Sequence, residues 1–137
     1  HSIRPVGKRP PAWCKYTPEE VESTVVKLAK EGHTPSRIGV ILRDQYGVPL
    51  TKPIVGKTII EIMQQAGLAP SMPEDLEVLQ RRASGIVVHL DKNRKDAFNI
   101  RSLQQVEAKI HKLAKYYKRQ GVLPPDWKYE AKTASLV

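Results

Sequence analysis

The sequence predicts an all-α protein, in which a small N-terminal helical bundle is followed by a long antiparallel helical hairpin. Three observations predict this fold. Apolar residues recur at steps of three and four along five segments, which is the period of one helix face. Glycine and proline separate these segments, and no stretch alternates apolar and polar residues convincingly, as a half-buried strand does. A small β element over residues 48–55 is the alternative that stays open.

Four parts are expected along the chain: an extended basic arm over residues 1–15, the bundle over 16–69, the hairpin over 70–121 and a C-terminal tail over 122–137. The arm shows no hydrophobic period and contains three prolines, which remove backbone donors and restrict φ. A plain disordered terminus is the alternative interpretation of this segment. Its cations are Arg4, Lys8, Arg9 and Lys15.

Three short helices are expected in the bundle. Thr17-Pro18-Glu19-Glu20 is typical of a helix start, because threonine caps, proline suits the first position and glutamate stands three residues after the cap. This helix ends before Gly32. Thr34-Pro35-Ser36 begins a second helix that ends near Gly47, and a third runs from about Lys57 to Gly67. The residues expected to face inward are Val21, Val25, Leu28, Ala29, Ile38, Ile41, Leu42, Ile59, Ile60, Ile62 and Met63.

The hairpin follows a break over Pro70–Pro73. Acidic residues Glu74 and Asp75 suit the first turn of a long amphipathic helix. A polar turn is expected over Asp91–Phe98. The last helix ends at Gly121, and Trp127 and Tyr129 then fall in a tail without a period. The apolar seams of the two helices are Leu76, Leu79, Ala83, Ile86, Val87 and Leu90 in the first, and Leu103, Val106, Ile110, Leu113 and Tyr117 in the second.

The charge of the chain indicates a polyanionic partner. Lys and Arg number 23 against 14 acidic residues, which gives a formal net charge of +9 and an isoelectric point near 9.8. Such a balance favours nucleic acid over an acidic membrane surface. No window is apolar for long enough to span a bilayer, so no membrane partner is expected. The single Cys14 excludes an intramolecular disulfide framework and indicates a reducing, intracellular compartment.

Cations are concentrated in residues 92–119, where they outnumber the acidic Asp96 and Glu107. Many lie off the apolar seam, so one side of the last helix is expected to neutralise phosphates. A solvated helix face is the alternative, but such faces usually mix charges of both signs. The nine cations are Lys92, Arg94, Lys95, Arg101, Lys109, Lys112, Lys115, Lys118 and Arg119.

Short polar side chains lie between these cations in the turn. Asn93, Asp96 and Asn99 are candidates to meet base edges or ribose hydroxyls in a shallow RNA minor groove, although Asp and Asn are also common helix caps. Tyr116 and Tyr117 point about 100° apart on a helix. We expect Tyr117 in the core and Tyr116 free to stack on a sugar or a base.

Catalytic and metal chemistry find no support in the sequence. The four histidines are scattered without metal-ligand spacing, and Cys14 has no histidine nearby. The glycines never form a phosphate-binding loop. We therefore expect no enzyme activity, no catalytic residue, no metal and no cofactor.

Several runs of residues resemble the small-subunit ribosomal protein S-fifteen family, in its archaeal and eukaryotic branch. They cover nearly the whole chain: Thr34-Pro35-Ser36, Ile38-Gly39-Val40-Ile41-Leu42-Arg43-Asp44, Gly67-Leu68-Ala69-Pro70, Pro73-Glu74-Asp75-Leu76, His89-Leu90, Asn93-Arg94-Lys95-Asp96, Tyr116-Tyr117-Lys118 and Val122-Leu123-Pro124-Pro125-Asp126-Trp127-Lys128-Tyr129. The tail Thr133-Ala134-Ser135 is more similar to eukaryotic members.

The resemblance implies a non-enzymatic constituent of the small ribosomal subunit that functions in translation. It implies binding to a three-way junction in the central domain of small-subunit ribosomal RNA, support for platform assembly and a contact to the large subunit across an intersubunit bridge. Neighbouring small-subunit proteins are further expected partners, and no homo-oligomer is expected. The expected location is the cytoplasmic ribosome, with a nucleolar stage during assembly if the source is eukaryotic.

The resemblance also assigns roles to single residues. It implies that Asn93, Asp96 and Asn99 recognise a distorted minor groove of the RNA. It also implies that Tyr116 contacts the junction and that Arg101 and Lys112 are basic contact residues. Asn93 and Asn99 stand where bacterial members commonly carry other residues. The full set of expected RNA-binding residues is Arg4, Lys8, Arg9, Asn93, Arg94, Lys95, Asp96, Asn99, Arg101, Lys109, Lys112, Lys115, Tyr116, Lys118 and Arg119. We expect both termini, residues 1–15 and 122–137, to be mobile in the free protein and ordered on RNA or neighbouring proteins.

The main rival is a helix-turn-helix DNA-binding protein formed by residues 34–67. Its recognition helix over residues 57–66 would expose only Lys57, Glu61, Gln64 and Gln65, which is little base-reading and phosphate-binding chemistry for the major groove.

Overall fold

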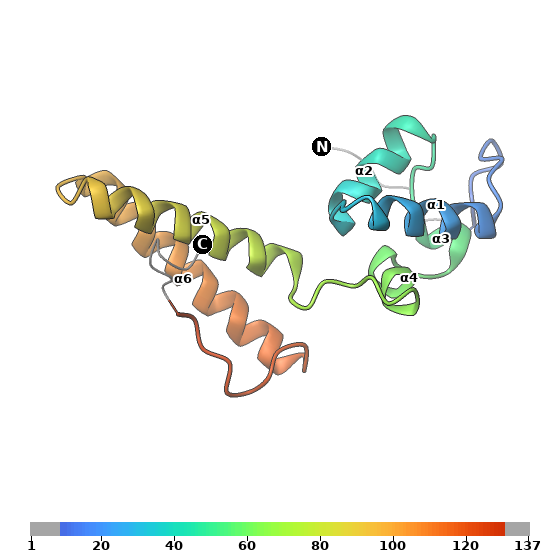
Figure 1. Cartoon of the computed structure of the whole chain (residues 1–137). Coiled ribbons are helices and arrows are strands. Elements are labelled where there is room, and N and C mark those ends of the chain that lie inside the picture. Colours follow the sequence, from blue (N-terminus) through green and yellow to red (C-terminus); the bar gives the residue numbers. More distant parts are fainter. Residues whose placement is uncertain (1–8, 131–137) are drawn as a thin grey trace. The chain divides into compact units, whose positions relative to one another are not determined.

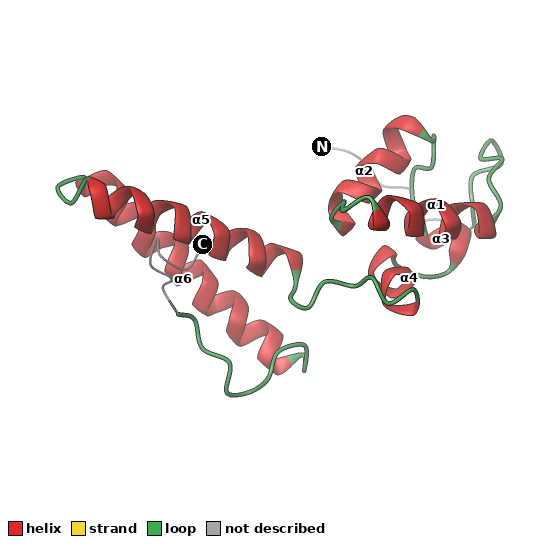
Figure 2. Ribbon diagram, viewed as in Figure 1, coloured by secondary structure: helices red, strands yellow, loops and turns green. Residues whose placement is uncertain are grey.

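The structure is a computed structural model and describes residues 9–130 of the chain. Within these residues it contains helices and no strand, which confirms the all-α prediction (Figure 1; Figure 2). The helices form two compact units that divide between Ala69 and Pro70. The first unit contains α1 (Pro18–Lys30), α2 (Pro35–Gln45), α3 (Lys52–Val55) and α4 (Ile59–Gln65), and the second contains α5 (Glu74–Lys92) and α6 (Ala97–Arg119).

Threonine side chains cap α1 and α4. Thr17 Oγ1 accepts a hydrogen bond from the Glu20 backbone N–H at 3.3 Å, and the Glu20 carboxylate accepts one from the Thr17 N–H at 3.1 Å. Thr58 and Glu61 form the same capping box. These pairs satisfy N–H groups that have no partner within the helix. Thr34 precedes Pro35 at the start of α2, but its side chain makes no capping bond.

The first unit has its own apolar core, built from α1, α2, α4 and Val48. The predicted inward faces of α1 and α2 are confirmed, but Ile60 is 50% exposed and the prediction that it faces inward is wrong. The physical reason is helix geometry, because Ile60 lies about 200° around α4 from the buried Ile62. The buried residues are Val21, Val25, Leu28, Ile38, Ile41, Leu42, Val48, Ile62 and Met63.

The short helix α3 was missed by the sequence prediction, which favoured an irregular, proline-interrupted segment and left a β element open. Pro53 lies in the first turn of α3, where its missing N–H costs no helical hydrogen bond. Gly56 ends α3 with φ at +79°, a conformation that glycine adopts without a steric penalty, and its N–H donates to the Lys52 carbonyl. The predicted helix from about Lys57 begins at Ile59.

The second unit is the predicted hairpin, in which α5 and α6 lie side by side (Figure 1). Leu76 and Ile110 are fully buried, with 0% of each side chain exposed. The predicted residues Leu79, Ile86, Leu103, Leu113 and Tyr117 are partly buried against this core. The buried set is Leu76, Ala83, Val106, Ile110, Ala114 and Leu123.

The turn of the hairpin is tighter than the predicted Asp91–Phe98. Helix α5 continues to Lys92 and α6 begins at Ala97, which leaves residues 93–96 between them. Asn99 therefore lies in the first turn of α6 and not in the loop. Polar residues at 91, 92 and 99 and the exposed Phe98 concealed these helix ends, because such residues are compatible with both a loop and a solvated helix.

The segment after α6 packs against the core of the hairpin. Gly121 adopts φ +76°, and the Val122 N–H donates to the Tyr117 carbonyl at 3.0 Å. Leu123 is only 6% exposed, and Trp127 and Tyr129 pack against the same core. This packing was not predicted, because apolar residues at irregular spacing give no periodic signal, and the mobility of residues 122–130 in the free protein stays a prediction. Residues 131–137, like residues 1–8, lie outside the part that the structure describes.

Candidate nucleic-acid interface

The face of α6 opposite the hairpin core is cationic. Arg101, Lys112 and Arg119 lie roughly 180° around the helix from the buried Ile110. The only acidic residue of α6, Glu107, is half-buried and accepts a hydrogen bond from the Tyr129 hydroxyl at 3.5 Å. The exposed cations of α6 are Arg101, Lys109, Lys112, Lys115 and Arg119, and Lys118 is half-buried.

None of these six cations forms an ion pair with another residue in the range 9–130. Other cations of the protein do have acidic partners: Arg81 lies 2.9 Å from Glu77, and Arg43 lies 2.8 Å from Asp44. Because the α6 cations have no acidic partner among the described residues, they are free to replace the counterions of a phosphate backbone. This arrangement supports phosphate binding over the alternative of a mixed, solvated helix face.

A hydrogen-bond network holds the tip of the hairpin. Asp96 Oδ1 accepts from the Asn99 backbone N–H at 3.2 Å, and Asp96 Oδ2 accepts from the Asn99 side-chain amide at 2.6 Å. The Asp96 Oδ2 atom also lies 2.8 Å from His89 Nε2. Asn93 completes the network, because its side-chain amide donates to the His89 carbonyl at 3.3 Å. The network therefore ties the end of α5 to the start of α6.

The same network determines the protonation of Asp96. Hydrogen bonds from the Asn99 side chain, from His89 and from the Asn99 backbone lower the pKa of Asp96 to about 2. The carboxylate is therefore ionised at neutral pH and acts as the N-cap of α6. The capping role left open by the sequence is present here, and any contact of Asp96 with RNA would be additional. Arg94 and Lys95 are the exposed cations beside it.

The two adjacent tyrosines have different surroundings. Tyr116 is 47% exposed, whereas Tyr117 is half-buried against the hairpin core. The Tyr117 hydroxyl donates to the Asp75 carboxylate, at 2.7 Å from Oδ1 and 2.6 Å from Oδ2. Burial and then this carboxylate raise the pKa of Tyr117 to about 12. Tyr116 meets the Tyr117 ring edge-on at 5.3 Å and remains available to a partner.

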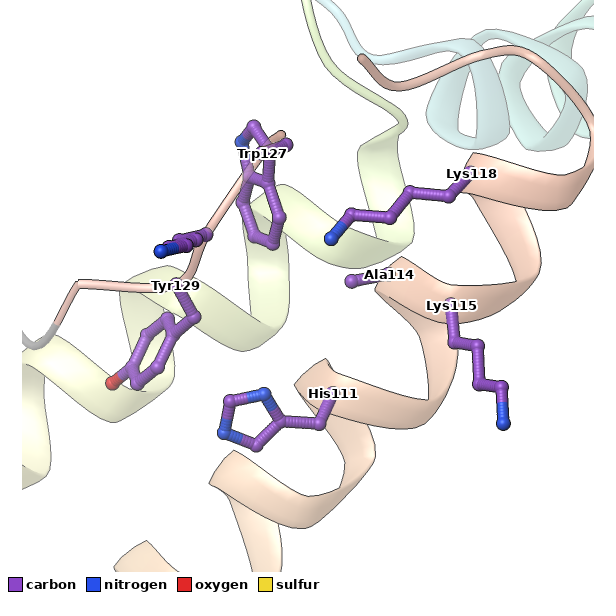
Figure 3. Close-up of a pocket in the computed structure, with 7 residues that line it drawn as sticks. His111, Ala114, Lys115, Lys118, Trp127 and Tyr129 are labelled. Carbon is purple, nitrogen blue, oxygen red and sulfur yellow. The ribbon is translucent and has the colours of Figure 1, made fainter. Parts of the chain in front are cut away.

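A pocket that the sequence did not reveal lies between α6 and residues 127–129 (Figure 3). Three rings, His111, Trp127 and Tyr129, and the cation Lys118 line it together with Lys115 and Lys128. Only the Trp-Lys-Tyr run after two prolines was a signal in the sequence, and its position relative to α6 was not predictable from it.

The remaining expected contacts lie in the N-terminal arm. Arg9 is exposed, while Arg4 and Lys8 fall outside the described residues.

No group of three or more His, Cys, Asp or Glu side chains in residues 9–130 is placed to hold a metal ion. Across the same described helices, none is both long enough and apolar enough to cross a membrane.

Comparison with known proteins identifies relatives along the whole chain. A protein of Nitrosopumilus maritimus named small ribosomal subunit protein uS15 is 48% identical over 136 residues, which cover 99% of this chain and 91% of the relative. Proteins of the same name are 49% identical in Staphylothermus marinus, over 100% of this chain and 90% of the relative, and 49% identical in Cenarchaeum symbiosum, over 99% and 91%. These relatives are archaeal, and the eukaryotic source suggested by residues 133–135 stays a prediction.

Two family models match the chain. One, described as Ribosomal S13/S15 N-terminal domain, matches residues 1–48, and the other, described as Ribosomal protein S15, matches residues 59–137. The relatives are named as ribosomal proteins and not as enzymes, which confirms that expectation. The match covers the cationic helix, the hairpin tip and the pocket, together with the bundle that precedes them, and the chain therefore belongs to the ribosomal protein S15 family.

Proposed function

We propose that the protein is a structural constituent of the small ribosomal subunit and that its hairpin binds a three-way junction in the central domain of small-subunit ribosomal RNA. Through this contact it supports assembly of the platform, and it reaches the large subunit across an intersubunit bridge. Membership of the S15 family and relatives named as small-subunit proteins support the proposal.

The observation that carries the RNA-binding part is the cationic face of α6, whose lysines and arginines form no ion pair within residues 9–130. From Arg101 to Arg119 this face extends about 27 Å, at about 1.5 Å per residue. Its length allows contact with several successive phosphates of a helical RNA. Long lysine and arginine side chains on a rigid helix supply attraction that does not depend on base sequence. Tyr116 adds an exposed ring that can stack on a sugar or a base.

The hairpin tip supplies recognition of RNA shape. The network of His89, Asn93, Asp96 and Asn99 fixes the tip in one conformation, and Arg94 and Lys95 extend the cationic surface to it. Asp96 Oδ2 already contacts the Asn99 amide and His89, but Oδ1 accepts only the Asn99 N–H, so its second lone pair has room for a ribose hydroxyl while the residue caps α6. A prearranged tip loses little entropy when it enters a groove.

The DNA-binding alternative gains nothing from the structure. Its proposed recognition helix, α4, has only seven residues. Lys57, the cation that precedes it, lies 3.5 Å from the Glu22 carboxylate and donates to Gln65 Oε1 at 3.0 Å. This lysine is already engaged within the first unit, and α4 offers no unpaired cation for phosphate contact.

The proposed location is the ribosome in the cytoplasm, with a nucleolar stage in assembly if the organism is eukaryotic. Neighbouring small-subunit proteins are the proposed protein partners, and the protein is proposed to act as a single copy. Arg4, Lys8 and Arg9 of the N-terminal arm are proposed as further RNA contacts.

Sedimentation with purified small subunits tests the proposal. The double variant Lys112→Ala, Lys115→Ala should be released at lower salt than the unmodified protein, because it loses two phosphate contacts. The matched control is Lys27→Ala, Lys30→Ala, which removes the same charge from α1 and should remain bound. Recovery of the unmodified protein in a subunit-free, ribonuclease-insensitive fraction would refute the proposal, and equal release of the two double variants would refute the role of α6.

A further inference from the structure

The pocket beside α6 combines aromatic rings and lysine side chains. Its volume is about 340 Å³. One wall presents the rings of His111, Trp127 and Tyr129, and none of the residues that line the pocket is acidic. The residues Ala114, Lys115, Lys118 and Lys128 complete the lining. Aromatic faces suit a planar base, and ammonium groups without acidic neighbours in the lining suit a phosphate.

The aromatic wall is held in place by the protein. His111 and Tyr129 meet edge to face, with ring centroids 5.8 Å apart and planes at 90°. The Tyr129 hydroxyl donates to Glu107 on α6, and burial followed by this carboxylate raises the pKa of Tyr129. Residues 122–130 are anchored by the buried Leu123. The wall therefore exists before any ligand binds, which lowers the entropic cost of binding.

The side chains of Lys115 and Lys118 point in different directions. In Figure 3 the Lys118 side chain extends toward Trp127, while Lys115 points away from the rings. Lys118 is half-buried and has no acidic partner in the described residues. Lys118 is thus placed to meet a negative group on a ligand that lies against Trp127, and Lys115 serves the outer face of α6.

We propose that this pocket binds one unstacked nucleotide of RNA, with its base against Trp127 and its phosphate on Lys118 and Lys128. Its volume lies near the lower end of the roughly 300–1,000 Å³ typical of small-ligand sites, which suits one nucleotide. An acidic peptide would engage the lysines but would leave the three rings without a partner. The proposal deepens the proposed function and rests on it, because it adds a second, single-stranded contact to the duplex contact of α6.

Fluorescence of Trp127 tests the proposal directly. The chain has two tryptophans, so Trp13→Phe leaves Trp127 as the only indole. Trp13 is 65% exposed and belongs to no core, so this change should not affect folding. A four-nucleotide oligoadenylate should quench the emission in a saturable manner, because a stacked base contacts the ring. Inorganic phosphate and a tetraglutamate peptide, which have no base, should not quench it at the same concentration.

Binding of a labelled oligoadenylate, followed by anisotropy, measures the contribution of each residue. Trp127→Ala should weaken binding roughly 5- to 150-fold, the range expected when one base loses its stacking partner. Trp127→Phe should retain most of the affinity and shows whether the loss comes from stacking or from misfolding. Lys118→Ala should weaken binding, whereas Lys109→Ala, which removes a cation of α6 outside the pocket lining, should have a smaller effect.

Three outcomes would overturn the proposal: no saturable quenching by the oligonucleotide, equal loss of affinity in Lys109→Ala and Lys118→Ala, or displacement of the oligonucleotide by tetraglutamate. These outcomes are independent of sedimentation with small subunits. A protein that co-sediments but shows no quenching would refute the pocket alone. A protein that shows quenching but does not co-sediment would refute the proposed function alone.

Discussion

Replacement of Tyr117 by phenylalanine isolates one hydrogen-bonded contact that joins the two helices of the hairpin. The Tyr117 hydroxyl donates to the Asp75 carboxylate across 42 residues of sequence, at 2.6 Å from Oδ2. Asp75 lies in the first turn of α5, and Tyr117 lies near the end of α6. Phenylalanine keeps the ring that packs on the core and removes only the donor. The variant should therefore fold to the same hairpin with lower stability.

The structure limits the size of this effect. A hydrogen bond to a charged group typically stabilises a protein by about 1.5–3 kcal/mol, but Asp75 is exposed and water can replace the lost donor. We therefore expect a loss of about 0.5–1.5 kcal/mol. In a unit of this size each kcal/mol corresponds to about 4–8 °C, so the melting temperature of the hairpin should fall by roughly 2–12 °C.

The pH dependence gives an independent test. The pKa of Tyr117 is about 12 in the folded protein and about 10 in an unfolded chain. Because the folded pKa is the higher one, the contribution of this group is complete below about pH 10 and is lost as pH rises toward 12. The difference in melting temperature between the unmodified protein and Tyr117→Phe should accordingly narrow over this interval.

Thermal melts followed by circular dichroism between pH 7 and pH 11.5 measure both effects. A double-mutant cycle with Asp75→Asn separates the direct contact from the effect of Asp75 on the first turn of α5. Tyr116→Phe is the matched control, because its ring is exposed and its hydroxyl makes no bond to Asp75: it should leave the melting temperature unchanged. Equal melting temperatures for Tyr117→Phe and the unmodified protein at pH 7 would show that the contact contributes nothing to stability.

Three further changes have defined outcomes. Lys112→Ala should make the dependence of log K on log salt shallower by roughly one unit, for junction RNA and for an unrelated duplex alike, as measured by a salt titration. Asp96 has a folded pKa of about 2, so its stabilising effect is present above about pH 4 and is lost as pH falls toward 2. The gap in melting temperature between the unmodified protein and Asp96→Asn should narrow in that interval. Leu123→Ala should cost about 2–5 kcal/mol and accelerate proteolysis within residues 122–130.

Each of these changes has a control and an opposing result. Lys30→Ala should leave the salt dependence of RNA binding unchanged. If the slope of log K against log salt for Lys112→Ala equals that of the unmodified protein, Lys112 touches no phosphate. Asparagine at position 96 remains a good N-cap, so an identical pH profile of the two proteins would exclude a charged cap. Val122→Ala, at a position 57% exposed, is the control for Leu123, and equal proteolysis of the two variants would contradict an anchoring role.

Local patterns in the sequence were sufficient for α1, α2, α5 and α6 and for the charged face. The capping box at Thr17 and Glu20 and the apolar period of α1, α2, α5 and α6 act over three to seven residues, a range in which helix geometry alone determines which side chains are neighbours. The position of the α6 cations was predictable for the same reason. Once the segment is taken as a helix, the apolar seam that includes Ile110 determines which residues lie on the opposite face.

Local patterns were not sufficient where a residue has two local solutions. Pro53 suits both an irregular segment and the first turn of a helix, and the structure places it in the first turn of α3, which ends before Gly56. Asp96 and Asn99 suit both RNA recognition and capping. The 2.8 Å contact of Asp96 with His89 shows that the folded tip uses this carboxylate for its own structure.

By itself, the sequence determined the all-α class, the order of the long helices, the cationic face and the family, because these depend on spacing within one segment or on long runs of characteristic residues. Only the tertiary structure decided what residues 122–130 do. Leu123, Trp127 and Tyr129 follow no period, and their partners lie on helices far away in the sequence: the Tyr129 hydroxyl reaches Glu107 across 22 residues. Contacts of this kind depend on the path of the chain after Gly121. The pocket exists because that path returns along α6 and places aromatic rings beside lysines that the sequence alone left unconnected.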